Sequence, residues 1–513
     1  MNYKKIGKIL GKIMILEGIM MLLPLLISFI YREDSVHKFA FIVPIAALVL
    51  FGFLLQIPKL KHDILYQKEG FALTALVWIV MGVFGAIPFV ISGVLPNYID
   101  ALFEIISGFT TTGSSLIYDI GTVSHSILFW RSLSQWIGGM GILVFVLIFI
   151  PESNEGSSMH LLRAESPGPQ VGKIASKMKV TARILYLIYL GMTVLLAIIL
   201  MFDEPISGYE NDQVFLSVLS AFSCASTGGF SFIPGSFELF HPFSQYVISV
   251  FLILFGCNFT LYYLLIIGKI RAIFKSEEFR TYIIITATAV ACVFASLIWR
   301  FEVFPQAYTV EEAFRHSLFQ VASIMTTAGY TTTDFNVWPM LAQTILIIVM
   351  FFGAMAGSTS GGIKLSRIVI AVKGTLINIR KLINPRYVPK AKFEGKCLEE
   401  NIINGVFAFI TLYFFILIAA VFILSLDPVN GDIVRIVSDA GEYEVKHGFF
   451  TNFSAAVACI SNIGPAFEAV GPYGSFAGYS EFSKVILTLT MLIGRLEILP
   501  VLILFSPKTW KKI

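Results

Sequence analysis

The sequence predicts an all-α polytopic membrane protein with ten transmembrane helices, and two observations predict this class. Hydrophobic residues make up 56% of the 513 residues, charged residues only 14%, and the mean hydropathy is +0.81. Because soluble domains carry about 25% charged residues, the composition excludes a soluble enzyme, a disordered chain and a basic nucleic-acid-binding protein. Apolar runs of about 20 residues, the length that crosses a bilayer as a helix, recur along the whole chain.

The apolar runs give ten candidate transmembrane helices. They fall at residues 12–30, 40–58, 71–93, 126–150, 182–202, 243–268, 281–299, 340–370, 402–426 and 482–506. No small-residue cleavage site follows the basic N-terminus, so we expect a retained first helix rather than a signal peptide. None of the five cysteines lies in a CxxC pair, which favours packed thiols over disulfides or a zinc site.

The charges of the connecting segments predict the orientation. Both tails and every second connection together hold 25 of the 37 Lys and Arg residues: 1–12, 59–69, 151–180, 269–280, 373–399 and the C-terminal end. Positively charged connections stay in the cytoplasm, so we expect a multi-pass protein of the cytoplasmic membrane with both termini inside the cell. The alternate connections are acidic, which indicates either ordinary solvation or an outer mouth that attracts cations.

Four outer connections contain a helical segment that is too short to cross the membrane and that ends in a polar turn with glycine. These half-spans are residues 99–109, 212–224, 310–325 and 446–460. Each unit therefore reads as helix, re-entrant pore helix, glycine turn and helix, and four such repeats around a central pore, after an extra N-terminal helix pair, use all ten runs. We expect the helix pair in residues 1–66 and the pore repeats in 67–165, 166–275, 276–385 and 386–513.

The four glycine turns have the composition of an ion-selectivity filter. They are Thr110-Thr111-Thr112-Gly113, Ser226-Thr227-Gly228-Gly229, Thr326-Thr327-Ala328-Gly329 and Ser461-Asn462-Ile463-Gly464, and their last glycines are 116, 100 and 135 residues apart. One such turn is common in ordinary loops, but four in register are specific. Non-helical backbone in a membrane must line a cavity or be buried, and rings of backbone carbonyl groups can replace the hydration shell of a monovalent cation.

The eighth run is interrupted by small residues that predict a gate. This stretch runs from Gly353 to Gly362 and is followed by Lys364, and the candidate gate residues are Gly353, Gly357, Ser358, Thr359, Ser360, Gly361, Gly362 and Lys364. Glycine at this density breaks a helix, so we expect an unwound loop that blocks the pore, or alternatively close helix packing. Arg495 lies within the last run, where a charge is costly. It predicts a barrier to cations, an anchor for the loop, or an ion pair with another helix.

These stretches resemble the TrkH/KtrB superfamily of potassium-uptake subunits over essentially the whole chain. Besides the four turns, the matching segments are residues 130–141, 256–259, 356–364 and 492–498. The extra N-terminal helix pair is similar to the TrkH branch. The resemblance implies K+ as the transported ion, bound at the filter residues, with no organic cofactor. It also implies a loop gate close to Arg495, a homodimer, and a cytosolic ring of TrkA-type nucleotide-binding subunits. Glycine in all four turns, including Gly113, goes with potassium preference in this superfamily.

We therefore expect a channel-like potassium-uptake subunit rather than an enzyme. Two transport alternatives stay open: a potassium symporter coupled to protons or sodium, and the membrane subunit of a potassium-pumping ATPase. A membrane-embedded enzyme or redox subunit would need paired histidines or clustered carboxylates in the apolar runs, and the sequence has neither. The sequence leaves the roles of Glu17, Glu104, Arg367 and Glu468 open.

Overall fold

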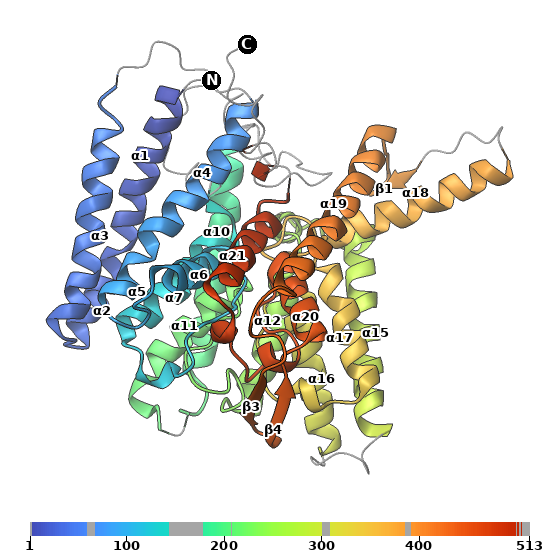
Figure 1. The fold of residues 1–513 in the computed structure, drawn as a ribbon. Helices are drawn as coiled ribbons and strands as arrows, with labels where there is room; N and C mark the ends of the chain where they lie inside the picture. Colours follow the sequence, from blue (N-terminus) through green and yellow to red (C-terminus); the bar gives the residue numbers. More distant parts are fainter. Residues whose placement is uncertain are drawn as a thin grey trace.

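The structure is a bundle of helices with two short β-hairpins (Figure 1). The computed structural model describes residues 3–58, 67–142, 178–206, 208–299, 308–384 and 391–498, together with positions 500, 501 and 504. The predicted domain boundaries at 66, 165 and 385 fall outside these residues and stay predictions.

The N-terminal helices form one side of the molecule, at the left in Figure 1. They are α1 (Tyr3–Met20), α2 (Leu22–Ile30) and α3 (Ser35–Leu54). Helices α1 and α3 pack closely at two glycines: a Cβ atom on Gly11 would lie 2.6 Å from the carbonyl oxygen of Gly52. Small residues permit such close contacts between apolar helices in a membrane.

Four units follow these N-terminal helices, and each unit consists of two helices on either side of a short pore helix. The first helices are α4 (Gln67–Gly85) with its continuation α5 (Ile87–Ile91), α10 (Met178–Met201), α15 (Glu277–Trp299) and α19 (Glu400–Leu424). The pore helices are α6 (Tyr98–Phe109), α11 (Gln213–Ser226), α16 (Val310–Met325) and α20 (Phe449–Ser461). The second helices are α7 (His125–Gly139), α12 (Pro242–Phe255), α17 (Met340–Phe352) and α21 (Glu481–Arg495). The pore helices lie within a few residues of the predicted half-spans.

The lengths of the helices confirm a polytopic membrane protein. Within the described ranges, six helices are long and apolar enough to cross a membrane, or seven if the bent pair of α12 and α13 (Phe259–Ile266) counts as one. The six are the two N-terminal spans and the first helix of each repeat. The runs at 126–150, 243–268, 340–370 and 482–506 hold the second helices, and their parts at 143–150, 502–503 and 505–506 lie outside the described residues.

The second helix of every repeat is interrupted, whereas the sequence singled out only the run at 340–370. Helix α7 ends at Gly139, α12 turns by 94° into α13, α17 ends at Phe352, and α21 ends at Arg495. Helix α17 is separated from α18 (Leu365–Ile383) by a longer segment, which we call the 353–364 loop. Two of the breaks lie next to a close backbone contact. A Cβ atom on Gly138 or Gly494 would collide with the carbonyl oxygen at the end of its own pore helix, on Phe109 or Ile460.

Two hairpins depart from the all-α prediction. Strands β3 (Ile433–Ser438) and β4 (Gly441–Lys446) pair antiparallel in the fourth repeat, in a segment that the sequence analysis assigned to an acidic loop. The available signals were the β-branched residues of β3 and the alternation of charged and apolar residues in β4. At the other end of the molecule lie α14 (Ile270–Lys275) and the small hairpin of β1 (Lys392–Phe393) and β2 (Lys396–Cys397).

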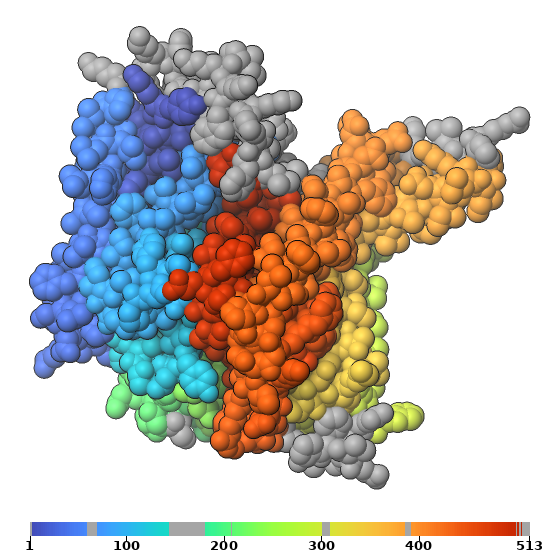
Figure 2. Space-filling view, viewed as in Figure 1, coloured from blue at the N-terminus to red at the C-terminus, as the bar shows by residue number. Residues whose placement is uncertain are grey.

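The repeats form a closed ring in sequence order. The second helix of each repeat packs against the pore helix of the next: α7 on α11, α12 on α16, and α17 on α20. Helix α21 then packs on α6 of the first repeat. Figure 2 shows this closure, with the red C-terminal helix seated against the blue and cyan first repeat. Helix α18 projects away from the bundle.

Candidate functional site

Each pore helix ends in the same backbone turn. A residue one or two positions after the helix end is left-handed in all four repeats, with φ of 55° at Thr111, 52° at Thr227, 58° at Thr327 and 56° at Asn462. In each repeat the next N–H group donates to the carbonyl five residues earlier, as in Thr112 to Ser107 at 2.9 Å and Ala328 to Ser323 at 2.7 Å. Left-handed threonines are unfavourable and persist only where the surrounding structure holds them.

The glycine two residues further on also has positive φ in every repeat. The values are 82° at Gly113, 84° at Gly229, 76° at Gly329 and 97° at Gly464. Gly228 is not in this conformation, so Gly229 is the residue that occupies the equivalent position in the second repeat. Only glycine adopts such backbone angles at little cost.

The four glycines touch one another around a ring. A Cβ atom on any of them would lie no more than 2.6 Å from the carbonyl oxygen of the residue before the glycine of another repeat. The contacts run from Gly113 to Gly228, from Gly229 to Ala328, from Gly329 to Ile463, and from Gly464 back to Thr112. The order is the order of the chain, and the last contact closes the circle.

A cavity of about 270 Å³ opens above this ring. Gly113, Gly229 and Gly329 form part of its floor together with Pro465. All four repeats contribute other lining residues, among them Tyr118, Arg131, Ile233, Thr331, Val437 and Tyr473. The glycine turns are therefore exposed to this outer cavity, which we call the vestibule.

A buried ion pair fixes the turn of the first repeat. Arg131 of α7 lies 2.8 Å from Glu104 of α6, and both side chains are buried. The carboxylate of Glu104 also accepts from the hydroxyl of Ser115 and the N–H of Leu116, while Arg131 donates to the carbonyl of Ser231 at 3.0 Å. The pair therefore holds the segments that leave the first and second turns. The sequence left the role of Glu104 open, and in the structure this residue is part of a buried ion pair beside the first turn.

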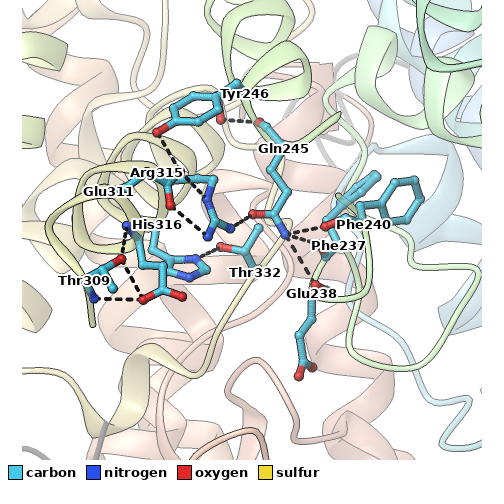
Figure 3. Close-up of polar contacts among 12 residues, drawn as sticks. Phe237, Glu238, Phe240, Gln245, Tyr246, Thr309, Glu311, Arg315, His316 and Thr332 are labelled. Atoms are coloured by element: carbon cyan, nitrogen blue, oxygen red, sulfur yellow. Dashed lines mark hydrogen bonds and ion pairs between the residues drawn. The ribbon is translucent and has the colours of Figure 1, made fainter. Parts of the chain in front are cut away.

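A second network joins the second and third repeats (Figure 3). Arg315 of α16 lies between Gln245 of α12 and Glu311, and it donates to both side chains. The amide of Gln245 donates in turn to the carbonyls of Phe237 and Phe240, at 2.9 and 3.0 Å. Gln245 of the second repeat therefore holds the carbonyl groups that follow the second turn, and Arg315 of the third repeat holds Gln245 in place.

Carboxylates hold the other two junctions. Asp334 and Asp439 tie the third repeat to the β3–β4 hairpin: Tyr443 donates to Asp334, and Thr333 donates to Asp439 at 2.7 Å. Between the fourth and first repeats, Lys484 of α21 pairs with Asp100 of α6 at 2.8 Å. All four junctions are therefore bridged by charged side chains, although the residues differ.

Burial changes the ionisation of carboxyl groups beside the vestibule. Burial raises the pKa of Glu238 above its usual value, the hydrogen bond from Tyr473 lowers it in part, and Asp439 raises it. Burial likewise raises the pKa of Asp334, against the opposing hydrogen bond from Tyr443. The hydroxyl of Tyr473, which lines the vestibule, donates to Glu238 at 2.6 Å.

The 353–364 loop lies directly beneath the turns. The N–H of Gly361 donates to the hydroxyl of Thr327 at 2.7 Å, and a Cβ atom on Gly361 would collide with the carbonyl oxygen of Ser461. The loop also joins the break of the second repeat, where the N–H of Met355 donates to Gly256 at 3.1 Å. Thr359 and Ser360 are buried.

Arg495 connects this loop to the first repeat. Its guanidinium donates to the carbonyl of Thr359 at 2.9 Å and to the carbonyls of Gly138 and Gly139, at 2.5 and 2.7 Å. The hydrogen bond to Thr359 corresponds to one of the three roles predicted for Arg495, that of an anchor for the loop. The two bonds to the break of α7 could not be foreseen, because that break was not predicted.

The charges next to the loop are also engaged. Arg367 of α18 pairs with Glu497 and stacks 4.0 Å from the ring of Phe409, so it joins two repeats instead of extending into solvent. Lys364 donates to the carbonyl of Ser360 at 2.5 Å. Glu278 of α15 was not among the predicted site residues. Its buried carboxylate accepts from the N–H of Ala356 in the loop at 2.8 Å.

Known proteins are similar to this chain over its full length. The sequence model of the TrkH family, described as a cation transport protein, matches residues 37–512. The Trk system potassium uptake protein TrkH of Escherichia coli strain K12 is 34% identical over 521 residues, covering 100% of both chains. The Trk system potassium uptake protein TrkG of the same strain is 31% identical and covers 98% of this chain and 97% of its own. The crystal structure of the potassium transporter TrkH from Vibrio parahaemolyticus matches with a TM-score of 0.82 at 29% identity, with 100% of both chains covered.

Proposed function

This chain belongs to the TrkH family of cation transport proteins, and from that premise we propose that it is a channel-like potassium-uptake subunit of the cytoplasmic membrane. Relatives of similar length carry the name of Trk system potassium uptake proteins. The observation that carries the proposal is the closed ring of four glycine turns. A ring of backbone carbonyls that faces a vestibule is suited to replace the hydration shell of K+.

In this proposal K+ enters from the outer vestibule and loses water at the turns that end in Gly113, Gly229, Gly329 and Gly464. It then reaches the 353–364 loop, which with Arg495 forms the barrier. An inward-negative potential supplies about 2.3 kcal/mol per charge for each 100 mV, which is sufficient to drive a cation inward without a second energy source.

The loop is suited to act as a gate because it is held between the repeats by hydrogen bonds, which a conformational change can exchange. Arg495 and Thr327 each contact it from a different side, and its glycines allow the backbone to change conformation. We further propose that a cytosolic TrkA-type nucleotide-binding ring moves this loop, that the subunit is a homodimer, and that both termini lie in the cytoplasm. The basic connections support this orientation.

The filter assignment is tested by Gly113→Ser in vesicles that contain the purified protein. A Cβ atom at this position would lie 2.5 Å from the carbonyl oxygen of Gly228, so we expect the ring to distort and the preference for K+ over Na+ to fall. Gly93→Ser is the matched control, because Gly93 also has positive φ but has no neighbouring atom within 4 Å. If Gly113→Ser discriminates the two ions as well as the parent protein does, the filter assignment is wrong.

The same vesicles separate the proposal from its alternatives. A channel moves K+ in response to a membrane potential without a second ion, whereas a symporter carries a proton or a sodium ion inward with each K+. A pump subunit would show ATP-dependent transport only together with a separate ATPase. Potassium flux that follows the potential without ATP and without an accompanying flux of protons or sodium supports the channel-like mechanism.

A further inference from the structure

The 353–364 loop has an anchor on α15 that the function proposed above does not use. Glu278, in the first turn of α15, accepts from the N–H of Ala356 at 2.8 Å. The side chain is almost completely buried, with 5% of its surface exposed. A buried carboxylate is costly unless it is hydrogen-bonded, so this contact with the loop compensates for part of that cost.

The same turn of α15 is held from its other side by Glu394. The carboxylate of Glu394 accepts from the N–H of Glu278 at 2.9 Å and from the hydroxyl of Ser276 at 2.8 Å. It therefore caps the N-terminus of α15, where the unpaired N–H groups of the helix favour a negative charge. One residue, Glu278, thus receives the cap through its backbone and holds the loop through its side chain.

Glu394 adopts an unfavourable backbone conformation to reach this position. It lies in the two-residue turn between β1 and β2, with φ of 50°, followed by Gly395 at 73°. Turns of this type favour asparagine, aspartate or glycine at the first position, and glutamate there is strained. A residue that breaks a local rule indicates that its side chain is needed, and here the side chain caps α15.

Residues 391–398, which we call the inner turn, are rigidly attached to the bundle. Phe393 is buried in a small cluster with Ile370 of α18 and Val406 of α19. Lys373 of α18 donates to the carbonyl of Lys392 at 2.7 Å and pairs with Glu277 of α15. A displacement of the inner turn is therefore transmitted to the first turn of α15.

We propose that Glu278 is a positioning residue that holds the 353–364 loop in its blocking conformation, and that the cap by Glu394 couples this anchor to the inner turn. A force on the inner turn then moves the first turn of α15 and weakens the bond to Ala356. The inference rests on the proposed function, because it requires the loop to be the gate. It adds a second site of control, distinct from Arg495.

The test measures potassium uptake into vesicles by the full-length protein without a partner, for Glu278→Ala, Glu394→Ala and the double variant. We expect Glu278→Ala to raise the maximal rate about tenfold, the effect of losing one hydrogen bond to a charged group that stabilises the closed state. The K+ concentration for half-maximal uptake and the K+/Na+ discrimination should not change. Glu278→Gln, which keeps an acceptor oxygen, should raise the rate less than Glu278→Ala.

The double variant decides whether the two glutamates act in series. If they do, Glu394→Ala raises the rate by itself but adds little to Glu278→Ala. Glu399→Ala is the matched control, since this exposed glutamate lies close to the inner turn and its side chain makes no capping hydrogen bond. It should behave like the parent protein.

Two results would overturn the inference. One is an unchanged maximal rate for Glu278→Ala in protein that retains its K+/Na+ discrimination. The other is a fully additive double variant, which would mean that the cap and the anchor act separately. If Glu278→Ala does not fold, an unchanged rate for the surface variant Glu394→Ala overturns the coupling by itself. The proposed function fails separately, through Gly113→Ser.

Discussion

The outer and inner halves of the four repeats differ in symmetry. In the outer half, four pore helices end in the same left-handed turn and four glycines touch in a ring. In the inner half, all four second helices end early, and among the residues that the structure describes only the third repeat has a long segment, the 353–364 loop, between two helices. A ring that surrounds an ion needs four equivalent contributions, whereas a barrier needs only one segment that moves. The difference teaches that duplicated units keep their symmetry only where the proposed chemistry requires it.

The largest effect should come from breaking the symmetric half with Gly329→Ala. A Cβ atom there would collide with the carbonyl of Ile463 and lie 2.6 Å from Pro465. Overpacking of this kind costs about 1–3 kcal/mol, so we expect K+/Na+ discrimination to fall about tenfold or more in vesicle flux. Gly431→Ala, at a position with positive φ and open space, should leave discrimination intact. Equal discrimination in both variants would contradict the ring.

The next effect should come from the asymmetric half, with Arg495→Ala. The change removes the hydrogen bonds that join Thr359 of the loop to Gly138 and Gly139. We expect potassium flux without a partner to rise about tenfold, because hydrogen bonds to charged groups are worth about 1.5–3 kcal/mol. Arg495→Lys should restore little, since an ammonium group cannot reproduce the planar fork of a guanidinium. Flux that still requires the partner would exclude this role.

A smaller effect should distinguish two residues that are equivalent in the ring. Thr327 accepts from Gly361 of the loop at 2.7 Å, whereas the hydroxyl of Thr111 has no hydrogen-bond partner within the described structure. Loss of one neutral hydrogen bond costs about 1 kcal/mol, so Thr327→Val should raise partner-free flux a few-fold, and Thr111→Val should not. A similar rise in both variants would show that the hydroxyl acts on the ring rather than on the loop.

The smallest effect should appear in the pH dependence of uptake. Burial raises the pKa of Glu238, so this group takes up a proton at a higher pH than an exposed glutamate. As the external pH falls, the vestibule loses a negative charge, and uptake at low K+ concentration should decrease. In Glu238→Gln, uptake at neutral pH should be about twofold lower, since two unit charges about 4 Å apart in water interact by about 1 kcal/mol and Glu238 acts on the ion across the vestibule, and its decrease on acidification should be smaller. Glu204→Gln, at an exposed carboxylate away from the vestibule, serves as the control, and identical pH profiles for parent and Glu238→Gln would contradict the assignment.

The symmetric half could be predicted from the sequence, whereas most of the asymmetric half could not. The pore helices and the positions of Gly113, Gly229, Gly329 and Gly464 follow from local patterns that recur four times. The breaks after Gly139 and Phe255 escaped prediction because they are only a few residues long and do not interrupt the apolar run. The partners of Arg495 and Glu278 escaped because contacts between residues far apart in sequence leave no local pattern. The β-branched residues of β3 and the alternation in β4 were visible, but the segment was interpreted as a solvated acidic loop.

The closure of the ring also has a consequence for synthesis of the protein. Gly464 must meet Thr112, and Lys484 must meet Asp100 across 384 positions of the chain. Helices that enter the membrane one after another can form the first two ring contacts before the fourth turn is made, but α21, which packs the fourth repeat against α6 of the first, is made later still. A chain truncated before Glu481 would therefore contain all four glycine turns and still lack the helix that closes them into a pore. Helix α21, and not the last pore helix, is therefore the element whose synthesis completes the ring of repeats.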